Sequence, residues 1–269
     1  MTSPERTTPS RPIRVAVQLQ PQHMPDYRAI RDAVRRYEDA GVDVVFNWDH
    51  FFPLYGEADG PHYECWTMLA AWAEQTERIE FGALVTCNSY RNPDLLADMA
   101  RTVDNISDGR LILGIGSGWF ERDYDEYGYD FGTKGSRLDD LGAALPRIES
   151  RWSRLRPAPV RDIPVLIGGG GEKKTLKYVA RHGDIWHYFM DVETYRHKAA
   201  VLEEHCRAEG RDPAEIERSA EIGDESVDEM LRKADEMRAE GITLFTLGVN
   251  GPDYPVDKAR ALVEWRDRG

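Results

Sequence analysis

The sequence predicts an α/β protein folded as a (β/α)8 TIM barrel. Strand-like and helix-like segments alternate along the chain, eight strand-like runs can be distinguished, and 269 residues suit one such barrel. The same alternation is compatible with a doubly wound open sheet, but the strand number and the chain length favour the barrel. We predict one barrel domain over residues 13–269, preceded by a polar, proline-rich and disordered tail over residues 1–12.

Each expected strand is a short apolar run that ends at polar or glycine residues. The eighth run, "ITLFTLGV", is clear, whereas the seventh, "IERSAEI", is the weakest because charged residues interrupt it. In chain order the runs cover Ile13–Gln20, Val42–Asn47, Ile79–Cys87, Arg110–Gly116, Ile163–Gly171, Asp184–Phe189, Ile216–Ile222 and Ile242–Val249.

The segments between the strands carry apolar residues three or four positions apart, which is the period of a helix packed on one face. Gly41 ends the first of these segments, and Pro93 stands in the first turn of the third. By contrast, Ser117–Gly135 is polar and rich in glycine, so we expect a long loop there. The helices are expected around Ile30–Tyr37, Trp66–Ala73, Leu96–Ile106, Arg137–Trp152, Lys174–Arg181, Thr194–Glu209, Val227–Met237 and Val256–Val263.

Charge and composition exclude several classes of partner. The net charge of −13 disfavours nucleic acid and anionic membranes, and no apolar run reaches the ~20 residues that span a bilayer. The N-terminus lacks the apolar core of a signal peptide. Cys65, Cys87 and Cys206 form no CxxC pair, which fits reduced thiols in the cytoplasm. We therefore expect a cytoplasmic protein that acts on a small molecule.

In a TIM barrel, functional residues concentrate at the carboxyl ends of the strands. Asp49 and His50 directly follow the second strand, where they can form a capped turn, a metal site or an acid–base pair. No further His stands at metal-ligand spacing, and the position at a strand end favours acid–base chemistry. Other strand ends bring side chains that can line the same mouth: Gln18, Trp186 and His187.

Two glycine-rich turns follow the fourth and fifth strands. The run Gly114–Gly118 lacks the third glycine of the dinucleotide fingerprint, since Trp119 stands in that place. This run is compatible with a tight turn or with close approach of a ligand to the backbone. The run Gly168–Gly171 precedes a helix that carries Lys173 and Lys174, and its bare N–H groups favour a phosphate site over a simple flexible turn.

Four motifs together resemble the luciferase-like monooxygenase superfamily, and more narrowly its coenzyme F420-dependent oxidoreductases of actinobacteria. They are "NWDHFF", "GALVTCNSYRNP", "GRLILGIGSGWFERDYDEYG" and "IGGGGEKKTLKYVARHGDIW", so the resemblance runs from about Ile13 to Trp186 and continues more weakly beyond. It implies a (β/α)8 barrel, a homodimer, and the deazaflavin F420 as cofactor, with FMN as the alternative. A non-prolyl cis peptide that supports the ring in this family would fall around Leu84–Val85.

The resemblance also implies roles for individual residues. Asp49 would contact the deazaflavin, and His50 would lie at its reactive face as the catalytic residue. Sugar-phosphate dehydrogenases of the family carry a catalytic Glu where Trp119 stands here, so sugar-phosphate oxidation is not expected. The cofactor would rest on Leu84, Val85, Thr86, Gly116, Ser117, Gly118, Gly168, Gly169, Gly170 and Gly171, the substrate pocket would include Gln18, Trp119, Trp186 and His187, and no metal ligands are expected.

These observations predict a cytoplasmic F420-dependent oxidoreductase. It would transfer a hydride between C5 of the deazaflavin and a small alkene, imine, carbonyl or alcohol. Two alternatives stay open, because a shared fold does not decide function. One is an FMN-dependent luciferase-like monooxygenase, and the other is a non-catalytic carrier barrel that uses the Gly118–Gly135 loop as a partner surface.

Overall fold

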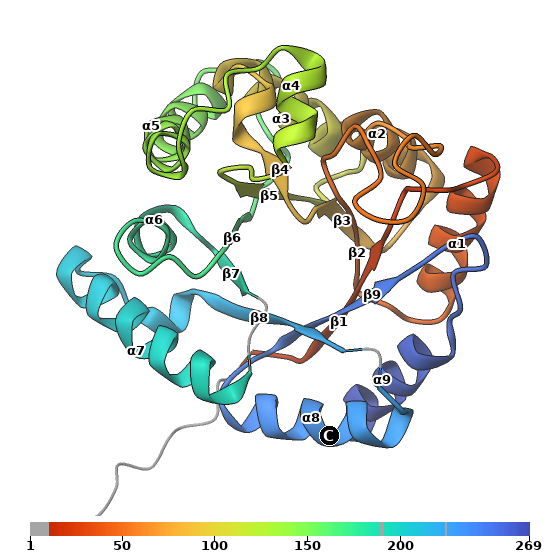
Figure 1. Cartoon of the computed structure of the whole chain (residues 1–269). Coiled ribbons are helices and arrows are strands. Elements are labelled where there is room, and N and C mark those ends of the chain that lie inside the picture. The colour runs from red at the N-terminus through yellow and green to blue at the C-terminus, as the bar shows by residue number, and fades with distance from the viewer. Residues whose placement is uncertain (1–10, 189–190, 224) are drawn as a thin grey trace, which may run out of the picture.

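The computed structural model describes residues 11–188, 191–223 and 225–269. Within these ranges the strands run parallel in the order β3-β2-β1-β9-β8-β7-β6-β5-β4, and a further β3–β5 pairing closes the sheet. Figure 1 looks into the resulting barrel, with the helices arranged around it. The predicted TIM barrel is confirmed.

The strands lie close to the predicted runs. The third run differs, because its single predicted strand is interrupted at a cis peptide between Leu84 and Val85 and continues as a separate short strand. This cis peptide is at the position that the family resemblance implies. The strands are β1 Arg14–Leu19, β2 Val44–Asn47, β3 Glu80–Ala83, β4 Thr86–Cys87, β5 Leu111–Gly116, β6 Val165–Gly168, β7 Ile185–Tyr188, β8 Glu217–Ile222 and β9 Leu244–Val249.

The helices also follow the prediction, with local sequence signals at their ends. Asn92 accepts a hydrogen bond from the Asp94 N–H and Pro93 occupies the first turn, so α3 begins as the sequence indicates. The helices are α1 Tyr27–Asp39, α2 Cys65–Gln75, α3 Pro93–Ile106, α4 Glu121–Tyr127, α5 Lys134–Trp152, α6 Thr175–His182, α7 Val192–Glu209, α8 Val227–Ala239 and α9 Asp257–Arg268, with 3-10 turns at Asn88–Tyr90 and Pro213–Glu215.

One prediction, the long loop after the fourth strand, needs correction, whereas the weakest strand prediction is confirmed. The expected long loop over Ser117–Gly135 contains the helix α4, which ends at Gly128 in the left-handed conformation, and the start of α5. The seventh run, although weak in sequence, is a regular strand, β8, paired on both sides. The tail residues 1–10 and Phe189 lie outside the described residues, so the predicted disorder of the tail stays a prediction.

The buried apolar residues form two layers. The larger layer fills the space between the strands and the surrounding helices, and contains residues such as Val15, Val17 and Trp72. The smaller layer fills the barrel interior with Ala16, Val44, Phe46, Leu84, Ile112, Leu166, Ile185 and Leu244. Alternate residues of each strand therefore face the two layers, as expected for barrel strands.

Ion pairs occupy the barrel end that lies below this interior layer. Arg14, at the start of β1, pairs with Glu80 of β3 and with Glu217 of β8, the latter at 2.5 Å. Arg161 pairs with the same Glu80 at 2.5 Å. The amino ends of the strands are thus joined by charges, which leaves the carboxyl ends as the open mouth.

Inward-facing glycines make room for the interruption between β3 and β4. A Cβ atom on Gly114 would lie 1.9 Å from the Ala83 carbonyl oxygen, and one on Gly82 would lie 2.2 Å from the Ile112 carbonyl oxygen. Such contacts with backbone atoms cannot be relieved by rotating a side chain. The strands can approach this closely only with glycine at both positions.

Gly114→Ala is expected to destabilise the fold by about 3 kcal/mol or more, because the new methyl group meets the Ala83 carbonyl. Gly135→Ala is the matched control, since its Cβ would meet nothing closer than 3.6 Å near the start of α5. We expect the control to be neutral or to gain up to about 1 kcal/mol. Urea unfolding followed by circular dichroism measures both, and a stable Gly114→Ala variant would contradict the packing described.

Candidate active site

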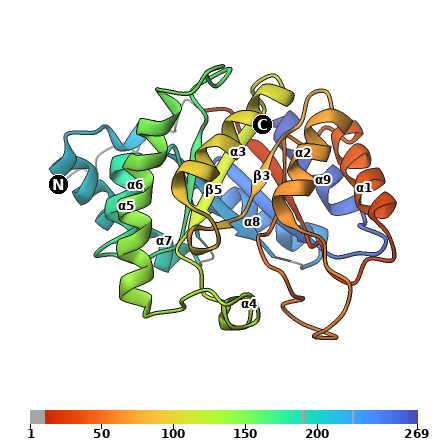
Figure 2. The same cartoon turned by 90° about the horizontal axis from the view of Figure 1, so that it is seen from above.

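The mouth of the barrel lies at the carboxyl ends of the strands. In Figure 2, α4 and the segment between β2 and α2 project beyond the strands on one side of the molecule. The space-filling view shows a hollow near the centre of the face seen in Figure 1, with hydrophobic residues along its upper side. The candidate residues of the β2 end lie at this mouth.

His50 is held by a buried carboxylate that the sequence did not single out. Its Nδ1 lies 2.7 Å from Oδ2 of Asp123, a residue of α4 with no exposed surface. Asp123 also accepts hydrogen bonds from the Phe51 N–H at 3.0 Å and from the Tyr90 hydroxyl at 2.9 Å. Because a carboxylate only accepts, His50 Nδ1 donates, and the Nε2 of a neutral ring is left as the acceptor.

Aromatic rings surround the imidazole of His50. Trp48, Trp119 and Phe120 each present an edge-on contact, at ring-centroid distances of 6.1, 5.7 and 5.5 Å. The Trp48 indole donates to His62 Nε2 at 2.9 Å, and burial lowers the pKa of His62 to about 4, so this acceptor stays neutral. Trp119 is 62% exposed and lies beside His50, and its place in a substrate pocket stays a prediction.

Asp49 is buried and fully hydrogen-bonded within the protein. Its side chain is 1% exposed, and the resemblance had implied direct contact with the cofactor. One carboxylate oxygen accepts from the Cys87 N–H at 3.0 Å and from Arg91 at 2.6 Å, and the other accepts from Arg91 at 3.0 Å. Arg91 also pairs with Glu64 at 2.9 Å. Asp49 therefore ties the end of β2 to the end of β4, beside His50.

The two charges of this pair influence one another. Burial raises the pKa of Asp49, and the Arg91 guanidinium opposes that rise. Burial lowers the pKa of Arg91, but the Asp49 and Glu64 carboxylates outweigh it and hold that pKa above its ordinary value. Removing either partner would leave the other charge buried.

Val85 forms an apolar surface between the glycines of neighbouring strands. A Cβ on Gly116 would lie 2.8 Å from one Val85 methyl, and a Cβ on Gly168 would lie 3.0 Å from the other. Both glycines thus provide space for Val85, which the resemblance alone did not indicate. Gln18 donates to the Leu84 carbonyl oxygen at 2.6 Å and so fixes the cis peptide from below.

The other predicted cofactor positions lie around this surface. Thr86 is fully buried, and Ser117 is half-buried. Gly118 has a φ of +78°, and a Cβ there would meet the Tyr124 hydroxyl at 2.0 Å. Gly169 has a φ of +123°, whereas Gly170 and Gly171 pack against Tyr188 and Thr175. A turn over residues 172–174 separates the glycines Gly168–Gly171 from α6, so Lys173 and Lys174 precede that helix, although the sequence predicted them to be part of it. Lys174 pairs with Asp139 at 2.6 Å.

Polar side chains line the opposite part of the barrel interior. His187 of β7 lies 2.8 Å from the Ser219 hydroxyl of β8, and both are buried. Trp186, its neighbour, belongs instead to the layer outside the strands, where it stacks on Tyr195 and donates to the Gly169 carbonyl oxygen at 2.9 Å. The structure thus brings Gln18 and His187 to the interior, but not Trp186, because successive strand residues face opposite sides.

Burial lowers the pKa of His187 to about 4, below its ordinary 6.5. An unfolded chain binds the proton first, so the stability that depends on the neutral ring is present above pH 6.5 and is lost as the pH falls towards 4. We expect His187 to account for a loss of about 2 kcal/mol between pH 7 and pH 5. Urea unfolding at both values tests this, and an unchanged pH dependence in His187→Gln would contradict it.

Asp123 and Arg91 are the site residues that the sequence reasoning missed. Asp123 lies in the segment expected to be a loop, yet Phe120, Tyr124 and Tyr127 recur there at helical spacing before Gly128. That spacing was the available signal. Arg91 had no comparable signal, since its partner Asp49 lies 42 residues earlier in the chain.

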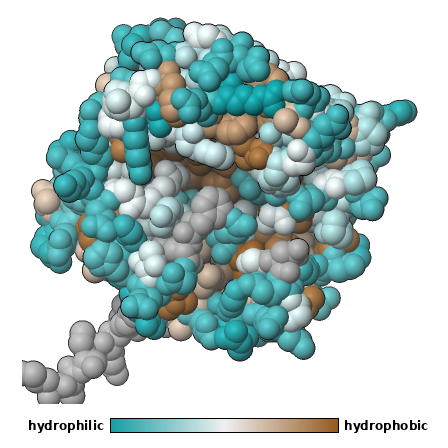
Figure 3. All heavy atoms as spheres, in the orientation of Figure 1, coloured by the Kyte–Doolittle hydropathy of each residue, from teal (hydrophilic) through white to brown (hydrophobic). Residues whose placement is uncertain are grey.

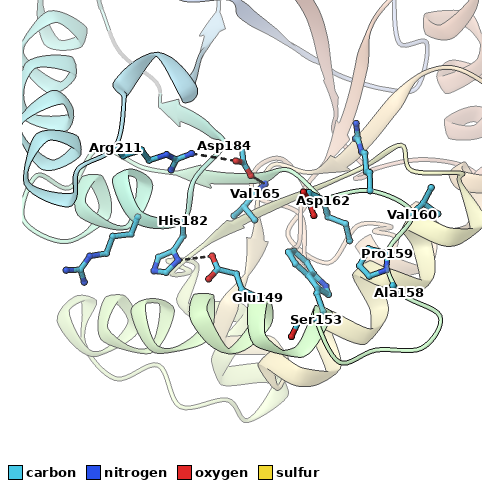
Figure 4. Close-up of a pocket in the computed structure, with 14 residues that line it drawn as sticks. Glu149, Ser153, Ala158, Pro159, Val160, Asp162, Val165, His182, Asp184 and Arg211 are labelled. Atoms are coloured by element: carbon cyan, nitrogen blue, oxygen red, sulfur yellow. Dashed lines mark hydrogen bonds and ion pairs between the residues drawn. The ribbon is translucent and has the colours of Figure 1, made fainter.

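A separate charged cavity of about 750 Å³ lies at the amino end of β6 (Figure 4). Within it His182 pairs with Glu149 at 2.8 Å, and Arg211 lies 3.7 Å from Asp184. This end of a TIM barrel serves stability and not catalysis. The mouth around His50 therefore remains the candidate active site.

The described residues contain no candidate metal site and no candidate membrane-spanning helix. Among the described residues, no three His, Cys, Asp or Glu side chains gather so that they could hold a metal ion. Within the same ranges, no helix is both long and apolar enough to cross a membrane.

Known proteins resemble this chain in sequence and in fold. Residues 10–242 match the family model of the luciferase-like monooxygenases. The chain belongs to this family. An F420-dependent glucose-6-phosphate dehydrogenase of Amycolatopsis mediterranei is 28% identical over 208 residues, which are 70% of this chain and 62% of that protein. The chain thus spans less than two thirds of that relative's length.

One further relative and one solved structure are also similar to this chain. An uncharacterized protein of Mycobacterium tuberculosis is 26% identical over 216 residues, which are 74% of this chain and 73% of that protein. An F420-dependent secondary alcohol dehydrogenase, solved with an F420-acetone adduct, superposes with a TM-score of 0.84 at 17% identity and covers 95% of this chain and 99% of its own. At this identity the likeness shows the shared fold.

Proposed function

We propose that this protein is an F420-dependent oxidoreductase that transfers a hydride to or from a small organic substrate at the barrel mouth. The observation that carries the proposal is the pairing of His50 and Asp123 beside the Val85 surface at that mouth. Relatives named as F420-dependent dehydrogenases support the choice of cofactor. The substrate class is an alkene, imine, carbonyl or alcohol.

The residues at the mouth fit a planar deazaflavin. A flat ring needs an apolar surface on one face, and Val85, held between Gly116 and Gly168, offers one. The Gly168–Gly171 backbone is half-buried to exposed just before α6, where its N–H groups would bind a phosphate group. We infer that these groups would hold the ring and the phosphodiester side of F420.

Each residue then has a defined task. When bound, F420 supplies or accepts the hydride at C5. In the reducing direction the protonated ring of His50 would give its Nε2 proton to the atom next to the carbon that receives the hydride, which is carbon in an alkene, nitrogen in an imine and oxygen in a carbonyl. In the oxidising direction the neutral ring would take that proton, and Nδ1 stays bonded to Asp123 in both. Trp48, Trp119 and Phe120 reduce the access of water to the imidazole. Asp49 and Arg91 keep the ends of β2 and β4 in register.

Titration with F420 and with FMN tests the cofactor. We expect fluorescence quenching of F420 at micromolar protein and no comparable binding of FMN. Tight FMN binding without F420 affinity would instead support the flavin-dependent monooxygenase. Bound F420 that no compound in a panel of alkenes, imines, carbonyls and alcohols oxidises or reduces would support the carrier barrel.

We also propose a homodimer formed through the α2–α3 face. A groove of about 510 Å³ lies between these helices, and Leu95 and Ile106 on it are 53% and 39% exposed. Such exposed apolar residues are typical of a protein interface. Light scattering should give twice the mass of one chain, and Leu95→Lys should shift the protein towards the monomer.

We place the protein in the cytoplasm. Cys65, Cys87 and Cys206 are free and buried, and they form no disulfide with one another. Unpaired thiols are typical of a reducing compartment.

A further inference from the structure

Glu221 lies near the carboxyl end of β8, three strands away from β2, which leads to His50. Along β8, Glu217 pairs with Arg14 at the closed end of the barrel, and Ser219 bonds His187 in the interior. Because side chains alternate along a strand, Glu221 continues the same inward face towards the mouth. It is half-buried, and it is paired in register with Thr246 of β9.

A glycine keeps space beside this carboxylate. A Cβ on Gly248 of β9 would lie 3.5 Å from Oε1 of Glu221 and 3.9 Å from Nε2 of Gln20. Both side chains therefore lie beside Gly248. In the described residues the buried Oε1 of Gln20 has no hydrogen-bond partner. The space beside Gly248 is thus bordered by the Glu221 carboxylate and the Gln20 amide, and by no side chain of its own strand position.

No positive charge of the described protein neutralises Glu221. Across the ranges that the structure covers, Lys, Arg and His residues form ion pairs with other carboxylates, but none with this one. Burial raises the pKa of Glu221. A half-buried carboxylate without a cation gains most from a ligand that brings one.

Aromatic residues connect this carboxylate to His50. Trp48 contacts His50 at 6.1 Å and Tyr55 at 6.2 Å between ring centroids. Tyr55 donates to Asn250, directly after β9, at 3.0 Å, and its pKa is raised by burial and by the charge of Glu221. Trp48 and Tyr55 thus form a row of rings that leads from the His50 imidazole towards Glu221.

We propose that the Glu221 carboxylate binds a positively charged nitrogen, an ammonium or iminium group, on the substrate. This inference rests on the proposed function, since it assigns the substrate class of the same mouth. Glu221 is then a specificity residue, which attracts cationic substrates and repels anionic ones. It takes no part in moving the hydride.

Binding of three probes of equal shape tests the proposal: cyclohexylammonium, cyclohexanol and cyclohexanecarboxylate. Calorimetry at pH 7, with saturating F420 and without it, gives their affinities for the full chain. We expect the ammonium to bind at least about ten-fold more tightly than the alcohol, and the carboxylate most weakly. In Glu221→Gln, which keeps the side-chain volume, the preference should fall to about two-fold or less.

Two further variants complete the test. Glu221→Asp keeps the charge and should keep part of the preference, while Glu121→Gln removes an exposed charge at the start of α4 and should leave it unchanged. A wild-type protein without the preference, or a Glu221→Gln variant that retains it, overturns the proposal. If F420 does not bind but the preference depends on Glu221, the cation site stands and the hydride-transfer function fails.

Discussion

His50→Ala is expected to slow hydride transfer by about 100- to 10,000-fold while F420 still binds. The imidazole is the acid–base group at the mouth, and its removal leaves Asp123 with the Phe51 N–H and the Tyr90 hydroxyl as donors. The fold should therefore survive. The oxidation of reduced F420 by the best acceptor of the panel, followed by absorbance, measures the rate, and fluorescence quenching measures cofactor affinity. Unchanged turnover would refute the catalytic assignment.

Asp123→Asn separates positioning from catalysis. An amide at this place can donate to His50 Nδ1. The proton of the neutral ring would then be on Nε2, so the imidazole would offer no acceptor at the mouth. We expect a lower rate and an altered pH–rate profile. The double variant His50→Ala/Asp123→Asn should be no slower than His50→Ala, because both changes act through one imidazole. Additive losses would show that Asp123 acts independently of His50.

Arg91→Met is expected to destabilise the protein by about 3–5 kcal/mol, because it leaves the Asp49 carboxylate buried without its cation. Burial raises the pKa of Asp49, and in the variant no guanidinium opposes that rise. The folded variant therefore binds a proton on Asp49 more readily than the unfolded chain, and its stability falls as the pH rises. The loss should therefore be larger at pH 8 than at pH 5. Urea unfolding at the two pH values measures it.

Two controls accompany this prediction. Asp49→Asn/Arg91→Met removes both charges and should recover much of the stability, since a neutral amide can still accept from the Cys87 N–H. Arg147→Met breaks an exposed pair with Asp94 and should cost no more than about 1 kcal/mol. Equal losses in Arg91→Met and Arg147→Met would show that burial does not govern the Asp49 pair.

Much of the fold followed from local sequence. Apolar runs gave the strands within a few residues, and helical spacing with Pro93 and its Asn92 cap gave α3. The exceptions were segments in which tertiary packing outweighed the structure that the local sequence favours. Glycine and charge in Ser117–Gly135 suggested a loop, but packing of Tyr124 against Tyr90 and Phe131 stabilises α4 there. The apolar run over Ile79–Cys87 suggested one strand, but in the structure β3 ends at Ala83, whose carbonyl oxygen lies against Gly114 of β5.

The site divides in the same way. The sequence placed His50 and Asp49 at a strand end, and the resemblance placed a cis peptide at Leu84–Val85. Neither could indicate that Asp49 pairs with Arg91, or that Gly116 and Gly168 accommodate Val85. Those contacts join strands that are neighbours in the barrel but distant in the chain.

The sequence by itself determined the alternation of strands and helices, the strand ends that carry polar residues, and the family. These features depend on residues close together in the chain, whose spacing decides which face is buried. Only the tertiary structure decided that Asp123, 73 residues from His50, is the partner of that histidine, and that Glu221 lies at the mouth without a cation among the described residues. The reason is that barrel closure sets which distant side chains meet, and the low polarity of the interior then sets how strongly they interact.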